Sequence, residues 1–303
     1  MKKALVILTA VLFAVSLFVG CKNEPGVKNY TVTFDSTGGT VTPEPQTHLI
    51  GEKVTKPEDP VKGGCTFMYW VTKDSKEFNF DTDTVTGDMT LYAMWKYKNY
   101  TLGSTGPAGG KIFYEADTIQ ESTYLDADGK EVTYTWKYLE VTAEDLEVTE
   151  GGTETSLFAF GNNGIVVSKN STGLEGENAA IGQGRYNTRA LVNTFGEKAS
   201  GDIIYAAKVC EDYETKVEGI TYDDWFLPSL GELDEIYKRK SNIGGTFDNY
   251  YLSSSESNEY SSWIEHFNNT YTGDNTLANA AGTQSETSRG NAGRGSVRAI
   301  RAF

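Results

Sequence analysis

The 303-residue sequence has few of the residues from which common catalytic and metal sites are built: two histidines and three cysteines. A structural zinc site needs four Cys or His ligands close together, and the chain offers no such cluster. A Ser-His-Asp hydrolase would have to use His48 or His266, and no Gly-x-Ser-x-Gly elbow supports either. We therefore expect no catalytic residues, no metal site and no cofactor.

Cysteine is also too scarce for a disulfide framework. Cys21 closes the N-terminal apolar run, which leaves Cys65 and Cys210 for the folded part. These two lie in different predicted domains, so each is interpreted as a small buried apolar residue. Stability is expected to come from hydrophobic cores.

Basic residues are in deficit: 27 Lys and Arg stand against 42 Asp and Glu, a net charge of −15. Loss of the first 20 residues removes Lys2 and Lys3 and brings the charge to −17. A surface this acidic repels nucleic acid and anionic lipid headgroups. We expect no nucleic-acid partner.

Long apolar runs are absent after the N-terminus. Residues 4–19 form one such run between Lys2-Lys3 and Gly20-Cys21, which is the order of a secretory signal peptide over residues 1–20. The run is shorter than the roughly 20 apolar residues of a transmembrane helix. A plain signal peptide with an incidental cysteine, or an uncleaved anchor helix, are the alternatives.

The segment Phe18-Val19-Gly20-Cys21 resembles the lipobox of bacterial lipoproteins. The resemblance implies cleavage before Cys21, lipidation of its thiol and a membrane partner held through that lipid. Two or three acyl chains make such an anchor stable. Residues 21–29 are then a lipidated tether, and the protein is exported and held at the cell envelope, on an outer surface or periplasmic face.

The rest of the chain predicts a β-rich α+β fold, because Gly, Tyr, Thr and Phe are plentiful and helix-period runs are few. A first domain over residues 30–96 contains predicted strands at 30–34, 67–71 and 89–95. Residues 97–104 are a linker, and residues 105–303 form a second domain.

The first domain resembles one Listeria–Bacteroides repeat, also called the internalin B-type repeat. The matching segments are VTFD at 32–35, GG at 38–39, KPEDP at 56–60, GCTF at 64–67 with Trp70, and LYAMW at 91–95. Cys65 and Tyr69 depart from the usual pattern. The resemblance implies a small β-grasp-like module of bacterial surface proteins, a stalk or interaction unit without known chemistry.

The second domain shows strand patterns at 111–114, 135–139 and 296–303, with a hairpin turn at Asp128-Gly129. A helix is predicted over 187–195, continuing after a break at 203–210. Another begins at Ser229, where Glu232 completes a capping box. Residues 268–295 are rich in Gly, Asn, Ser and Thr and predict a long mobile loop.

Six segments of this domain resemble the family named after the C-terminal domain of Legionella collagen-like protein. They are GPAGGKIFY at 106–114, WKYLE at 136–140, GQGRYNT at 182–188, DDWFLPS at 223–229 with Glu232 and Leu233, YLSSSE at 251–256 and VRAIR at 297–301. Leu252 stands where the family usually has Trp. The resemblance implies a C-type-lectin-like fold, related to formylglycine-generating enzymes, and hints at adhesion. Those enzymes need neighbouring reactive cysteines, whereas Cys210 is alone in its domain.

Three weaker site patterns have structural interpretations. Asp126, Asp128 and Glu131 form an incomplete calcium ladder, which a hairpin turn explains better. Glu256, Asn258 and Glu259 could offer loop oxygens but are typical of a solvated turn. Arg298 and Arg301 would face opposite sides of a strand, so one would pair with a carboxylate and the other meet solvent or ligand; pairing within the fold is favoured. Together with Arg289 and Arg294, these two residues form a basic cluster near the end of the sequence.

These patterns favour a surface-anchored, non-catalytic lipoprotein whose C-terminal domain binds a glycan or protein ligand, in the manner of an adhesin. A shallow aromatic-lined groove near residues 253–263 and 268–295 would support this hypothesis. The alternative is a structural or assembly component of the cell envelope. An enzyme with an unfamiliar acidic site is a third hypothesis, which would require two close carboxylates with opposed pKa shifts.

Overall fold

The computed structural model describes residues 28–40, 42–150, 153–167, 177–199, 201–247, 250–268, 270–271 and 277–303. The predicted signal peptide and Cys21 lie outside these residues. The chain divides into two compact units, one of residues up to Pro60 with Met68–Met94, the other of Val61–Phe67 with Trp95–Phe303. Strands predominate over helices in the described residues, which confirms the β-rich α+β class.

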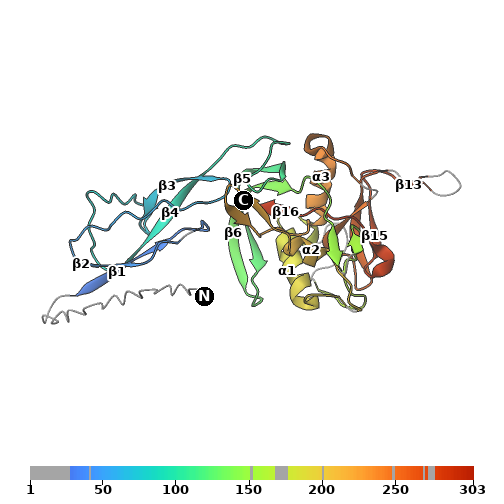
Figure 1. The fold of residues 1–303 in the computed structure, drawn as a ribbon, viewed down its shortest axis with the longest axis horizontal. Coiled ribbons are helices and arrows are strands. Elements are labelled where there is room, and N and C mark those ends of the chain that lie inside the picture. The colour runs from blue at the N-terminus through green and yellow to red at the C-terminus, as the bar shows by residue number, and fades with distance from the viewer. Residues whose placement is uncertain are drawn as a thin grey trace, which may run out of the picture. The chain divides into compact units, whose positions relative to one another are not determined.

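The repeat region forms a four-stranded sheet in the order β2-β1-β4-β3 (Figure 1). Its strands are β1 (Asn29–Asp35), β2 (Gln46–Leu49), β3 (Cys65–Val71) and β4 (Met89–Tyr97). The central β1 and β4 are parallel, and β2 pairs antiparallel with β1. Alternate residues of β1 and β4 face the core, so Val32 and Leu91 are each 0% exposed. The predicted strands at 30–34, 67–71 and 89–95 are therefore confirmed.

The second unit is built first on a long antiparallel hairpin, β5 (Lys111–Leu125) and β6 (Glu131–Val141). Its turn runs from Asp126 to Gly129, whose φ of 76° is the left-handed conformation that glycine adopts without strain. The short strand β16 (Ile300–Ala302) pairs with β6, so the end of the chain closes this sheet. The predicted hairpin is confirmed.

A second sheet has the order β11-β12-β15 and is antiparallel between neighbours. Three two-stranded ribbons accompany it. The bounds are β11 (Tyr250–Glu256), β12 (Ser261–His266) and β15 (Gln284–Ser288) in the sheet, and β7 (Val148–Glu150) with β8 (Thr153–Thr155), β9 (Thr215–Val217) with β10 (Ile220–Tyr222), and β13 (Thr270–Tyr271) with β14 (Leu277–Asn279) in the ribbons.

The helices are α1 (Gly184–Phe195), α2 (Ala206–Glu211) and α3 (Leu230–Ile243), with short 3-10 turns η1 (Glu177–Ala179) and η2 (Asn291–Gly293). α2 is a separate helix, packed against α1. The predicted start of α3 is confirmed, because Ser229 and Glu232 form both hydrogen bonds of a capping box. Among the described helices, none combines the length and apolarity needed to span a bilayer.

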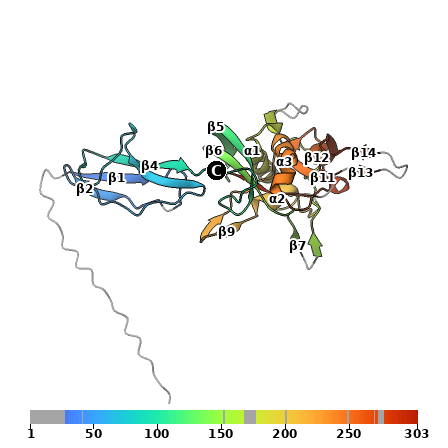
Figure 2. The same ribbon diagram turned by 90° about the horizontal axis from the view of Figure 1, so that it is seen from above.

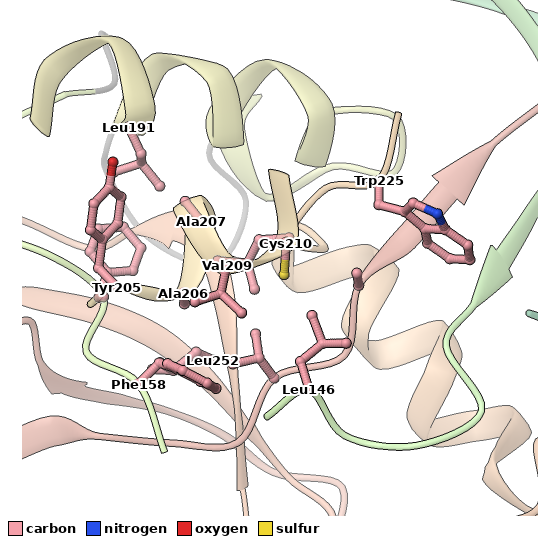
Figure 3. Packing of buried hydrophobic residues seen from close by; sticks show 14 of the residues in the cluster. Leu146, Phe158, Leu191, Tyr205, Ala206, Ala207, Val209, Cys210, Trp225 and Leu252 are labelled. Atoms are coloured by element: carbon pink, nitrogen blue, oxygen red, sulfur yellow. The ribbon is translucent and has the colours of Figure 1, made fainter. Parts of the chain in front are cut away.

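The main core of the second unit lies between α1, α2 and the β11–β12 sheet. Figure 3 shows Val209 and Cys210 of α2 directed toward Leu146 and Leu252, with Trp225 at one end of the cluster. Cys210 and Leu252 are 0% and 1% exposed. Cys210 and Cys65 are both free and buried, as interpreted from the sequence.

Two expectations for the C-terminal part are wrong. Residues 268–295 are not one long loop, because β15 and η2 lie within them and β15 pairs with β12. The strand expected over 296–303 is confined to Ile300–Ala302, and residues 296–303 do not alternate between core and solvent. They are buried on both sides, since the arginines among them have carboxylate partners inside the unit.

Candidate functional site

The second unit contains a hollow of about 920 Å³ on its surface, which we call the Trp225 hollow. It forms where the turn before β5, the segment after β6, the end of α1, and α2 with the following β9 meet. A volume of this size is in the range of roughly 300–1,000 Å³ typical of ligand sites. Its lining comprises Ala108, Gly109, Gly110, residues 142–149, Glu197, Lys198, Ile204, Lys208, Val209, Asp212, Tyr213, residues 215–217 and Trp225.

The floor of the Trp225 hollow is the edge of the main hydrophobic core. Leu146, Val209 and Trp225 belong to that core and are 6%, 8% and 3% exposed. Tyr213 is half-buried and meets Trp225 edge to face, with ring centroids 5.4 Å apart. Partly buried aliphatic side chains complete this surface: Val148, Ile204 and Val217. The floor is therefore apolar and formed by side chains that the core holds in place.

The rim of the hollow is charged and predominantly acidic. Lys208 lies 2.5 Å from Asp212 and 3.5 Å from Glu197, so these charges are partly neutralised within the rim. Further charged residues on the rim are Glu144, Asp145, Glu147, Lys198 and Lys216. Carboxylates thus outnumber lysines around an apolar floor.

The wall at residues 108–110 is fixed by a buried carboxylate. Glu140 of β6 is 0% exposed and accepts hydrogen bonds from the amides of Ala108 (3.2 Å) and Gly110 (3.1 Å). A Cβ at Gly106 would lie 2.3 Å from the Glu140 carboxylate, so only glycine allows the turn to wrap around it. This explains the glycine-rich run at 106–110, which serves the wall of the hollow.

Arg301 completes this support from the other side. Its guanidinium lies 3.2 Å from Glu140 and also donates to Asp224, the residue before Trp225. Burial raises the pKa of Glu140 to about 7, and the Arg301 charge and the two amides oppose that shift. One buried network therefore positions two parts of the hollow, the Ala108–Gly110 turn and the Trp225 segment.

A second buried arginine fixes the segment after β6. Arg298 is 1% exposed, and its Nε lies 2.6 Å from Asp145. Its guanidinium also donates to the carbonyl of Ala143 at 3.0 Å, while the Tyr251 hydroxyl donates to Asp145 at 2.8 Å. The residues that line this side of the hollow are consequently held before any ligand arrives, as in preorganised binding sites.

These contacts define the role of the arginines near the C-terminus. Pairing within the fold is confirmed for Arg298 and Arg301, and Arg289 likewise lies 2.7 Å from Glu256. The expectation that one of Arg298 and Arg301 meets solvent or ligand is wrong, because both are buried and paired. The interpretation of Glu256 as part of a solvated turn is also wrong: it lies at the end of β11 and is 2% exposed.

The other sequence candidates do not gather into a site. His266 is buried in β12 with its Nε2 2.8 Å from the Ser285 hydroxyl, and burial lowers its pKa. Burial raises the pKa of the Cys210 thiol well above its ordinary value. The Asp126 carboxylate is engaged by the amides of Asp128 and Lys130 in the hairpin turn. Within the described residues, no group of three or more His, Cys, Asp or Glu could hold a metal ion.

The Trp225 hollow does not lie where the sequence suggested a groove. A groove near residues 253–263 and 268–295 would have supported the binding hypothesis, whereas the lining of the hollow comes from segments between residues 108 and 225. Acidic and apolar residues are interspersed over 144–148. This pattern could have indicated the site, but it belongs to no motif. Trp225 and Leu227 are buried.

Comparison with known proteins supports the assignment of the first unit. Residues 30–94 match the family model described as the Listeria-Bacteroides repeat domain. The resemblance inferred from the repeat's sequence segments is thereby confirmed, over two residues fewer than the predicted 30–96.

Two relatives from Evansella cellulosilytica share part of the sequence. One, whose name describes it as a Gly-rich membrane protein, is 34% identical over 110 residues; another, named as a membrane protein, is 34% identical over 99 residues. These matches cover 34% and 32% of this chain but 12% and 15% of the relatives. The chain thus corresponds to a small part of either relative.

Proposed function

We propose that this protein is a surface-anchored bacterial lipoprotein whose C-terminal unit binds a ligand without chemistry, in the Trp225 hollow. The observation that carries the proposal is the hollow itself, an apolar floor braced on two sides by the buried Arg298 and Arg301 networks. Among the described residues, its lining includes no His, Cys or Ser, so it offers no Ser–His or Cys–His pair of the kind that activates a nucleophile. Such an arrangement favours binding over catalysis.

The anchoring half of the proposal rests on the sequence. The apolar run ending at Gly20-Cys21 supports lipidation of Cys21, with the lipid as the contact to a membrane of the cell envelope. The names of the two Evansella relatives are consistent with a membrane association. The repeat is typical of surface proteins and would act as a spacer between the anchor and the binding unit.

We also propose the finer fold types. The order β2-β1-β4-β3 with a parallel central pair supports a β-grasp-like repeat. In the second unit, the six segments with family resemblance meet in the core, and the last strand returns to β6 near the start of the unit. That closure of the chain ends supports a C-type-lectin-like domain.

The proposal is tested with the mature chain, screened against arrays of glycans, peptides and matrix proteins. A Thr149→Trp variant should fill the hollow from the exposed side of β7, and Thr153→Trp on the partner strand β8 is its matched control. We expect a specific ligand whose affinity falls at least about tenfold in T149W alone.

Two outcomes would count against this function. A ligand that binds T149W and T153W equally well would place the binding site elsewhere on the molecule. A blank array with a folded protein would favour the alternative, a structural or assembly component of the envelope.

A further inference from the structure

The lining of the Trp225 hollow is poorly suited to a glycan. Sugar hydroxyl groups are commonly bound by amide side chains, and the C–H face of a sugar ring stacks on exposed aromatic faces. The lining includes no Asn or Gln, and Trp225 is only 3% exposed. Its accessible apolar surface comes instead from Val148, Ile204 and Val217, beside Tyr213. Aliphatic or aromatic side chains of a ligand would fit this floor.

The rim adds a requirement for positive charge. Glu147 and Glu154 lie on the same face of the β7–β8 ribbon, since Glu154 is opposite Thr149 and side chains two apart share a face. The pKa of Glu147 is raised because the Glu154 carboxyl hydrogen-bonds to it and their charges repel. In the part of the chain that the structure describes, no Lys or Arg forms an ion pair with Glu144, Glu147 or Glu154.

The electrostatic field around the hollow is also negative. Residues 97–303 contain 17 Lys and Arg against 31 Asp and Glu, a net charge of −14. Such a field attracts cations over a distance set by the salt concentration. A ligand with a positively charged group would therefore approach the hollow favourably and meet carboxylates that have no Lys or Arg partner among the described residues.

The shape of the site favours an extended chain over a compact ligand. β7 and β9 both contribute to the lining, and each belongs to a ribbon in which, among the described residues, it pairs with one strand only. Figure 2 shows the ribbons that contain β7 and β9 projecting on the same side of the unit. Strand edges of this kind receive extended peptides, whose alternate side chains then enter pockets.

We infer that the Trp225 hollow binds an extended peptide segment of a partner protein, with Lys or Arg alternating with apolar side chains. The apolar side chains contact Tyr213, Val217 and their neighbours on the floor. The cationic side chains lie against Glu144, Glu147 and Glu154 on the β7–β8 side. This inference rests on the proposed binding function and narrows it to one class of ligand.

The test uses the mature chain and four defined probes, measured by isothermal titration calorimetry. Three are hexapeptides in which Leu alternates with Lys, Leu alternates with Glu, or Ser alternates with Lys; the fourth is a set of neutral oligosaccharides. We expect the Lys–Leu peptide to bind, with affinity that falls as salt is raised. The Glu–Leu and Lys–Ser peptides should bind at least about tenfold more weakly.

Charge variants separate a built site from general attraction. The double variant Glu147→Gln, Glu154→Gln should weaken Lys–Leu binding about tenfold or more, and T149W should abolish it. The control Glu121→Gln, Glu131→Gln removes two carboxylates from the β5–β6 hairpin and should have little effect. Equal losses in both double variants would overturn the inference, because the attraction would then be nonspecific.

The failure of this inference is distinguishable from failure of the proposed function. Binding of a neutral oligosaccharide that T149W abolishes, with no binding of the Lys–Leu peptide, would refute the peptide and retain the hollow as a binding site. No binding of any probe, together with a blank array, would refute both.

Discussion

Arg301 illustrates how single residues hold this domain together. It is 7% exposed and lies between Glu140 and Asp224, which are distant in sequence. Burying Arg301 and Glu140 is costly, but once they are buried each depends on its partners. The residue therefore contributes less to net stability than to the position of the parts that it joins.

Replacement of Arg301 by Met should destabilise the protein by about 3–5 kcal/mol, because the buried Glu140 and the partly buried Asp224 would be left without a cation. Urea unfolding of the mature chain measures the change. Lys130→Met, on the exposed hairpin turn, should alter stability by less than about 0.5 kcal/mol. A loss below about 1 kcal/mol for R301M would show that the network is dispensable.

Glu265 gives the protein a pH-dependent stability. It is 0% exposed on β12, and burial raises its pKa to about 7, an effect that Gln284 opposes and Asp234 of α3 reinforces. An unfolded chain releases this proton near the ordinary value of 4.5, whereas the folded chain retains it to about 7. The folded state binds more protons in that window, so stability falls as pH rises through it.

The midpoint of thermal unfolding should accordingly be higher at the acidic end of this window than above it. Glu265→Gln, which is neutral at every pH, should reduce the difference. Part of it should remain, since burial also raises the pKa values of Glu140 and Glu232 to about 7. An unchanged pH dependence in E265Q would show that Glu265 does not titrate as inferred.

Prediction of single residues from the sequence succeeded where the chemistry of the side chain alone determines whether it is buried. Cys65 and Cys210 were expected to be buried and are. It failed for Glu256, and for the environments of Arg298 and Arg301, because a charged residue is buried only where a distant partner meets it. Arg301 and Glu140 are 161 positions apart, and no local pattern reveals that pairing.

At the scale of elements, α3 shows how far local signals reach. Ser229 caps its first turn, and the Ser229 amide donates a hydrogen bond to the Glu232 carboxylate at 2.7 Å. The Ser229 hydroxyl also donates to the carbonyl of Ala180 at 2.8 Å, which ties the helix start to the segment before α1. The cap therefore serves both the helix and its packing.

Ser229→Ala should cost about 1–2 kcal/mol of unfolding free energy, at the upper end of the usual range for a lost cap. Chemical denaturation followed by circular dichroism measures it. Ser241→Ala, at an exposed position of the same helix, is the matched control and should be nearly neutral or slightly stabilising. Equal effects of the two substitutions would contradict the role of the cap.

Elements with local signals were predicted, and elements defined by distant neighbours were not. The β5–β6 hairpin and α3 carry their turn and cap residues within a few positions. β15 consists of polar residues, and only its pairing with β12 makes it a strand. The Trp225 hollow could not be predicted for the same reason, since its walls come from five separate stretches of chain.

At the scale of the whole molecule, the sequence predicted the repeat because its motifs occur in a fixed order. The repeat was expected over 30–96 and is matched over 30–94. The division into units has one feature that no motif indicated: Val61–Phe67 belongs with the second unit. Contacts across long sequence separations, which composition cannot report, determine such an assignment.

The proposed anchor would govern where both units act, and Cys21 can be tested in the living cell. Cys21→Ser removes the thiol to which lipid would be attached, so the protein should lose incorporation of labelled fatty acid. It should also lose the part of its detergent-phase partitioning that the lipid provides. Cys65→Ala is the control for a cysteine elsewhere in the chain and should keep its label. Labelled lipid on C21S, or a mature chain that begins at a residue other than Cys21, would contradict the lipoprotein assignment. Loss of label together with continued binding by the Trp225 hollow would show that the anchor positions the binding unit and is separate from recognition.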